Sequence, residues 1–238
     1  MYEELAKVKP TYVMHLPNTS KGEFAYKLWK DEMIRLKEEV EKSLGVTITE
    51  EDIRTAIKDK NEERELLKEF YALGKLQPSA LTGLELHNVL YQAGFKFDRG
   101  ELKHSLRKVI DDMKERYEKG ECPVQQKDAG ASVVAYELCG AIRSNDLLVD
   151  EEIEDVYDAL TQKYINIGCS CMMNNDNRIE LLDRIIDEYN VDAVIDVVLQ
   201  ACHTFNIESY RIREFVTKEK ISHLCLLKLI IQNQILNN

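Results

Sequence analysis

The most constraining feature of this chain is a change in the pattern of its apolar residues near Gly120. Between residues 20 and 120, apolar side chains recur every three or four positions, as along one face of an amphipathic helix. Beyond Gly120, short runs rich in Val and Ile alternate with further helical stretches. That alternation is typical of an open α/β sheet with helical crossovers. We therefore expect a helical segment followed by a Rossmann-like α/β domain.

Helix signals are strongest in the first part of the chain. Four helices are predicted, at residues 20–43, 49–74, 82–93 and 99–119. Ser20 and Glu23 fit a capping box, in which each side chain binds a free backbone N–H of the other residue. Gly94 is expected to end the third helix, because glycine is the usual residue just past a helix C-terminus.

Strands are predicted from short apolar runs, one near the start and the others after Gly120. These runs lie at residues 11–16, 131–136, 191–199 and 222–225. Between and after them, helical spacing predicts helices at residues 150–164, 176–189 and 208–217. The first predicted strand has little chain before it to pair with, so it is either an edge strand or the end of a larger sheet.

The charge balance limits the binding partners. The formal net charge is −11 and the pI is about 5.1, whereas nucleic acids and anionic membranes attract an excess of Lys and Arg. No apolar run approaches the roughly 20 residues of a transmembrane helix, and the first residues do not resemble a signal peptide. We therefore expect a cytoplasmic protein with no nucleic-acid or membrane partner, whose six cysteines are not structural disulfides.

Two cysteines follow predicted strands. Cys139 comes after the run at 131–136, and Cys202 comes after the run at 191–199. Ligands of open α/β sheets gather at the carboxyl ends of strands, and thiolates favour iron–sulfur clusters or zinc. A free cysteine is also commonly a small buried apolar residue, so both interpretations stay open.

Cys169 and Cys171 are separated by one residue, which is tighter than the usual spacing in a zinc site. A loop before a helix is the preferred interpretation of this pair. A zinc-binding module made of Cys169, Cys171, Cys202 and His203 is a further alternative. Arg143 is expected to be a solvated surface residue, with pairing to a phosphate as the alternative. The chain has no dinucleotide-binding, P-loop, nucleophile-elbow or HExxH motif.

Five stretches together resemble the 2-hydroxyacyl-CoA dehydratase D-component family, which includes benzoyl-CoA reductase subunits and double-cubane-cluster proteins. They are YVMHLPN (12–18), HNVLYQAGF (87–95), VVAYELCGAIRSND (133–146), CSCM (169–172) with RIELLD after it (178–183), and VDAVIDVVLQACHTFNIESY (191–210). The resemblance extends from the first residues to about Cys225.

The resemblance implies an oxygen-sensitive protein that binds a low-potential iron–sulfur cluster, either [4Fe–4S] or double-cubane. It implies Cys139 and Cys202 as cluster ligands, with Cys169 and Cys171 as weaker candidates. The implied partners are an ATP-dependent activator, a second subunit or homodimer partner, and an acyl-CoA or other small substrate. The implied activity is that of a 2-hydroxyacyl-CoA dehydratase, which is a lyase. A double-cubane-cluster reductase and an inactive remnant are the alternatives.

The chain departs from the family pattern in three places, so a truncated member is expected. Residues 1–19 resemble only the end of a first α/β domain, which would precede the helical segment at 20–120. The second α/β domain, at 121–225, lacks a strand, a Gly-Cys-Pro turn and a helix. Residues 226–238 do not continue as the family does. With a suitable choice of codons, the tail also reads as the family's IETDYS continuation when the frame starts one base earlier, near Leu226, so a frameshifted tail is expected.

These departures predict physical weaknesses in the chain alone. Unpaired strands leave buried N–H and C=O groups without partners, at about 1–3 kcal/mol each, against a domain stability of about 5–15 kcal/mol. We therefore expect marginal stability and weak cluster incorporation. The apolar tail is expected either to re-pair as a substitute strand or to drive aggregation.

Overall fold

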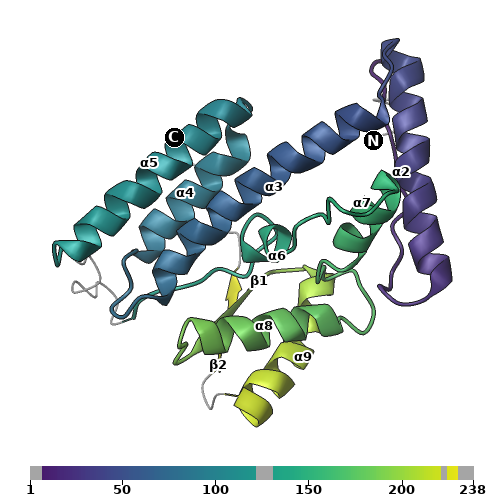
Figure 1. Ribbon diagram of the computed structural model, residues 1–238. Coiled ribbons are helices and arrows are strands. Elements are labelled where there is room, and N and C mark those ends of the chain that lie inside the picture. Colours follow the sequence, from purple (N-terminus) through teal and green to yellow (C-terminus); the bar gives the residue numbers. More distant parts are fainter. Residues whose placement is uncertain (1–6, 122–130, 221–223, 230–238) are drawn as a thin grey trace, which may run out of the picture.

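The computed structural model describes residues 7–121, 131–220 and 224–229 (Figure 1). The first of these ranges is helical. Its elements are α2 (Glu23–Leu44), α3 (Glu50–Ala72), the 3-10 turn η1 (Leu73–Lys75), α4 (Gly83–Phe95) and α5 (Arg99–Glu118). Helices α3, α4 and α5 lie side by side, and α2 stands apart from them against α7 (Figure 1). The predicted helical segment is therefore confirmed.

Capping explains where most of these helices begin. Thr49 forms a capping box with Asp52 at the start of α3, and Thr82 forms one with Glu85 at the start of α4. The predicted box at Ser20 is wrong, because Gly22 occupies the cap position with φ +95° and no side chain caps the helix. The predicted stop at Gly94 is also wrong, since α4 continues to Phe95.

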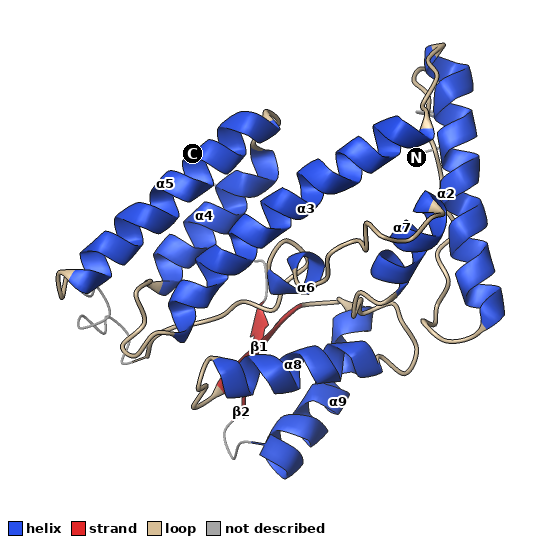
Figure 2. Cartoon of the chain, in the orientation of Figure 1, coloured by secondary structure: helices blue, strands red, loops and turns tan. Residues whose placement is uncertain are grey.

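The second part mixes short helices with a small sheet. Its elements are α6 (Ile142–Asn145), α7 (Val156–Ile165), α8 (Asp176–Glu188), β1 (Val194–Leu199), α9 (His203–Phe215), the π-helical turn η3 (Val216–Lys220) and β2 (Leu224–Leu229). Strands β1 and β2 pair in parallel, with Val194 opposite Leu224 and Leu199 opposite Leu229. The fold is thus mixed α/β and rich in helix (Figure 2). The described residues contain this two-stranded sheet where the sequence predicted an open Rossmann-like one.

Two predicted strands are wrong. Residues 131–136 form neither a helix nor a strand in the described part of the chain, and Val134, Ala135 and Tyr136 pack against the helical core instead. Residues 11–16 also form no strand, and side chains of α2 form hydrogen bonds with their backbone. Glu32 accepts a hydrogen bond from the N–H of His15, and Arg35 donates one to the carbonyl oxygen of Val13.

Other element boundaries also differ from the sequence prediction, and the strand predicted at 191–199 begins at Val194. The helix predicted from residue 150 begins at Val156, where the Asp155 side chain accepts two backbone N–H groups. The helix predicted from residue 208 already begins at His203. The last strand continues from Cys225 to Leu229, so the first residues of the apolar tail do extend a strand. Residues 221–223 and 230–238 lie outside the described ranges.

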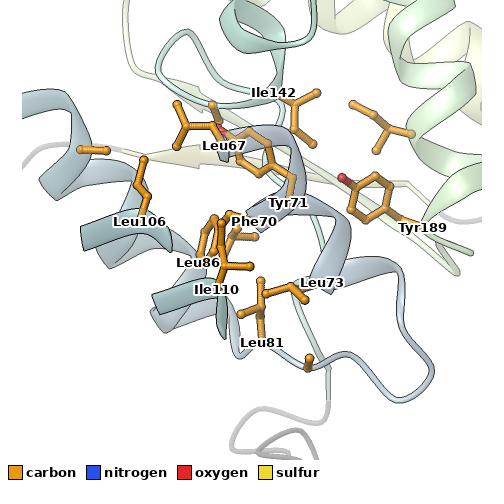
Figure 3. Close-up of a cluster of buried hydrophobic side chains, with 14 of the residues drawn as sticks. Leu67, Phe70, Tyr71, Leu73, Leu81, Leu86, Leu106, Ile110, Ile142 and Tyr189 are labelled. Carbon is orange, nitrogen blue, oxygen red and sulfur yellow. The ribbon is translucent and has the colours of Figure 1, made fainter. Parts of the chain in front are cut away.

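One apolar cluster joins the two parts of the molecule (Figure 3). Phe70 and Ile110 are fully buried at its centre, between α3 and α5. Ile142 from α6 and Tyr189, which follows α8, belong to the same cluster. Truncating a buried Phe costs about 3–5 kcal/mol, so this cluster is a principal source of stability. It also fixes the position of the chain on either side of α6.

The two faces of the small sheet differ. Val194 packs with a second apolar cluster formed by α8, α9 and η3, which covers one face. On the other face Ile195, Val197, Leu199 and Leu227 are about half exposed. Parallel sheets are normally covered on both faces.

In the described ranges, no helix is long and apolar enough to cross a bilayer.

Candidate thiol site

The predicted site cysteines lie on three loops of the second part. Cys139 lies in the turn before α6, Cys169 and Cys171 lie between α7 and α8, and Cys202 caps α9 directly after β1. All four are free thiols. Cys139 and Cys171 are exposed, whereas Cys169 and Cys202 are partly covered. Three loops from separate parts of the sequence therefore present sulfur atoms at or near the surface.

Arg143 connects the first of these thiols to the protein interior. Its Nη1 donates to Cys139 Sγ at 3.5 Å, and its side chain is only 1% exposed. Glu137 pairs with this guanidinium through both carboxylate oxygens. Burial acts to lower the pKa of Arg143, but the hydrogen bond and charge of Glu137 outweigh burial and raise the pKa. The prediction of a solvated arginine here is wrong.

A buried ionic network extends from Glu137 to α9. Arg178, on α8, donates to Glu137 Oε2 at 2.9 Å and lies 3.4 Å from Glu208 Oε2. The ring of Phe205 lies 5.6 Å from the guanidinium carbon of Arg143 and 5.2 Å from that of Arg178. Each buried charge thus has an opposite charge or a ring face beside it. The network thus connects the first turn of α9, through Phe205, to the loop of Cys139.

The loop between α7 and α8 brings two sulfurs together. The Cys171 thiol donates to Cys169 Sγ at a sulfur–sulfur distance of 3.3 Å. The pKa of Cys171 is raised to about 11, first by partial burial of its sulfur, although the residue as a whole is exposed, and then by the hydrogen bond and charge of Cys169. The charge of Cys139 also acts on Cys171, and the charge of Cys169 acts on Arg143. Cys139 and this pair therefore share one electrostatic environment.

The remaining predicted donors do not join this group. Cys202 Sγ lies 3.8 Å from the hydroxyl of Thr204, and His203 beside it is exposed. Among the described residues, no three His, Cys, Asp or Glu side chains are arranged to hold a metal ion. The alternative of a zinc module with Cys169, Cys171, Cys202 and His203 is thus not supported.

The network itself escaped the sequence analysis. Glu137, Arg178, Glu208 and Phe205 were not predicted as site residues, and Arg143 was predicted to be exposed. Charged residues usually lie at the surface, and only the packing of α8 and α9 reveals that these pair with one another. The one available signal was position, because all five residues fall inside stretches that carry the family resemblance.

An iron–sulfur cluster suits these residues in kind. Such clusters are held by cysteine thiolates, and the thiols here lie beside a buried cation that can offset negative charge. The described residues would supply part of a ligand set, since no three of them converge.

Comparison with known proteins defines the class. The sequence profile of the 2-hydroxyglutaryl-CoA dehydratase D-component family matches residues 1–227, and the chain belongs to this family. The resemblance noted from the sequence motifs is therefore confirmed. A relative in Escherichia coli (strain K12), named "Putative dehydratase subunit YjiM", is 40% identical over 240 residues. The match covers 92% of this chain and 62% of the relative, so the chain spans less than two thirds of the relative's length.

Proposed function

We propose that this chain is a subunit of an iron–sulfur 2-hydroxyacyl-CoA dehydratase, and that another polypeptide completes its cluster site. Cys139 and Cys202 are the proposed ligands from this chain, with Cys169 or Cys171 as a third. One observation carries the proposal. The buried network around Arg143 and Arg178 links the loop of Cys139 to α9, and Asn175 links Glu208 of α9 to the carbonyl oxygen of Cys169.

The residues of this chain would position the thiols and balance their charge. A bound cluster would supply electron transfer and an iron atom able to polarise an oxygen of the substrate. Arg143 would hold the Cys139 sulfur and place a positive charge beside it. Glu137 would fix that guanidinium from the side opposite the thiol. Phe205 would shield both arginines from water.

We further propose that the chain is incomplete with respect to its family. Residues 1–19 are assigned to the end of a first domain, 20–120 to the helical segment, 121–225 to a second domain with an internal deletion, and 226–238 to an altered tail. Length supports the deletion, because 92% of 238 residues is about 219, yet the alignment spans 240. About 20 positions of the alignment therefore have no counterpart in this chain. The open sheet face at Ile195 and Val197 is consistent with that loss.

The proposed partners follow from this assignment. A second subunit, or another copy of the chain, would cover the thiol surface and supply the missing ligands. An ATP-dependent activator would deliver electrons, and an acyl-CoA would be the substrate. We assign the protein to the cytoplasm, where reduced thiols persist, and expect it to be sensitive to oxygen.

Anaerobic reconstitution tests the proposal. The purified chain would be incubated with iron and sulfide, alone and together with a complementary dehydratase subunit, and bound iron and sulfide would be measured. Weak loading alone and loading near four irons per complex with the second subunit are expected. Cys139→Ser and Cys202→Ser should each lower the loading, whereas Cys225→Ser, at an exposed thiol on β2, should not.

Other outcomes separate the alternatives. Full loading by the chain alone would overturn the idea that the site is incomplete. About eight irons per chain would favour the double-cubane reductase. If the chain bound no iron under any condition, the alternative of an inactive remnant would be favoured. The half-exposed sheet face at Leu199 and Leu227 supports that alternative.

A further inference from the structure

We propose that Cys169 and Cys171 form a reversible disulfide with each other, oxidised by low-molecular-weight disulfides such as oxidised glutathione. Their sulfurs are 3.3 Å apart and already share a hydrogen bond. A disulfide bond is about 2.05 Å long, so the two sulfurs need to approach by about 1.2 Å. Because Cys171 is exposed, its side chain can make this movement without displacing a packed core.

The loop that carries the pair is held in place from both ends. At its start, a Cβ on Gly168 would lie 2.8 Å from Arg178 Cα, so the backbone approaches α8 as closely as only glycine permits. The carbonyl oxygen of Cys169 accepts the Met172 N–H at 3.0 Å and Asn175 Nδ2 at 2.8 Å. The two thiols are thus fixed near each other, which raises their effective concentration as in other preorganised intramolecular reactions.

A contact with the segment that precedes α2 further restrains the loop of the two thiols. The N–H of Met173 donates to the carbonyl oxygen of Asn18 at 2.6 Å. Asn175 also donates to Glu208 Oε2 at 2.8 Å, so the loop is linked to the buried ionic network. The geometry of the thiol pair therefore depends on tertiary structure and should be lost when the chain unfolds.

The chemistry is a two-step thiol–disulfide exchange. The Cys169 thiolate attacks one sulfur of the small disulfide, the sulfur–sulfur bond of that molecule breaks, and one small thiolate leaves. The Cys171 thiolate then attacks the Cys169 sulfur of the mixed disulfide, and the second small thiolate leaves. One protein dithiol and one small disulfide give one protein disulfide and two small thiols. Since a single residue separates the cysteines, the ring is small, and strained disulfides of this kind are readily reduced again.

This inference does not rest on the proposed cluster. Oxidation of the pair needs no metal, and its failure would leave the assignment of Cys139 and Cys202 untouched. If both proposals hold, the oxidised pair could not bind iron, so thiol oxidation would compete with cluster loading. The two ideas are separated by using metal-free protein in the test.

Thiol counting and peptide mapping provide the test. The full chain, reduced and free of metal, would be exposed to oxidised glutathione, quenched in acid, unfolded and alkylated. The thiol count should fall from the six of the sequence to four. Trypsin should release residues 164–178, which contain both cysteines and no others. This peptide should lack both alkyl groups and weigh two hydrogens less than the dithiol form.

Three controls make the result specific. Cys171→Ser should carry glutathione on Cys169 instead of an internal bond, while Cys225→Ser should still lose two thiols. Asn175→Ala, which removes a restraint on Cys169, should slow formation of the bond about three- to tenfold. Dithiothreitol should restore the full thiol count. Six persistent thiols, loss of thiols at other cysteines, or an equal rate in the unfolded chain would each overturn the proposal.

Discussion

Replacing Lys163 with methionine should change how the stability of the protein depends on pH. Lys163 lies on α7 and is only 4% exposed. Its Nζ donates to the carbonyl oxygen of Ser144 at 3.0 Å and lies 4.1 Å from the ring centre of Tyr164. Among the described residues, no carboxylate forms an ion pair with it. Burial, followed by the charges of Arg64 and Lys60, lowers its pKa to about 7.

The sign of the effect follows from proton binding. An unfolded lysine has a pKa near 10.4, so between pH 7 and pH 10 the unfolded chain binds more protons than the folded chain. Stability should therefore rise with pH across this window and level off below about pH 7, where both forms are protonated. Each pKa unit corresponds to about 1.4 kcal/mol, which sets an upper bound of roughly 5 kcal/mol. Local opening that hydrates the ammonium reduces this, and we expect about 2–3 kcal/mol.

Urea denaturation between pH 6 and pH 10 would measure the difference. Lys163→Met fills similar space without a charge, so its stability relative to the natural chain should be greatest at pH 6 and fall by about 2–3 kcal/mol towards pH 10. Lys27→Met, at an exposed lysine paired with Asp31, should give a curve parallel to that of the natural chain. If the Lys163→Met curve were also parallel, the burial argument would be refuted.

Substitutions at four further positions test other parts of the structure. Phe70→Ala should cost about 3–5 kcal/mol in urea denaturation because it empties the centre of the core, whereas Phe97→Ala, 88% exposed, should change stability by less than about 0.5 kcal/mol. Thr49→Ala removes the capping box of α3 and should cost about 1 kcal/mol, with Thr49→Ser restoring most of it. Arg178→Met leaves Glu137 and Glu208 short of a partner and should cost about 3 kcal/mol; unchanged melting would contradict a structural role for the network.

The helical segment was predictable because its signals are local. The spacing of Leu66, Leu67 and Phe70 identifies the buried side of α3, and Thr49 with Asp52 identifies its start. Neither signal depends on which other element the helix contacts. The wrong strand predictions at 11–16 and 131–136 have the opposite cause. A short apolar run predicts that its side chains are buried, but it does not identify the element that packs against them. In residues 131–136 the cover is the helical core, so no strand partner was needed.

The candidate site was predictable only in part. Strand-end position singled out Cys139 and Cys202, and their role as ligands stays a prediction, because the stretch before Cys139 is not a strand. The approach of Cys169 to Cys171 depends on the turn after Gly168, and the burial of Arg143 depends on helices that follow it by more than 30 residues. Such contacts between distant segments leave no periodic trace in a single sequence.

Because Ile142 and Tyr189 share one apolar cluster with Phe70 and Ile110, the two parts of the chain should melt as a single cooperative unit. Cutting the backbone between residues 121 and 131 would leave both fragments with apolar surface that the other had covered. Calorimetry should accordingly show one heat-absorption peak. The slowest amide exchange should be found together on α3, α5 and the inner side of α8. An event that loosens α8 at the thiol loop would then reach the C-terminal turns of α3, where Leu67, Phe70 and Tyr71 belong to this cluster.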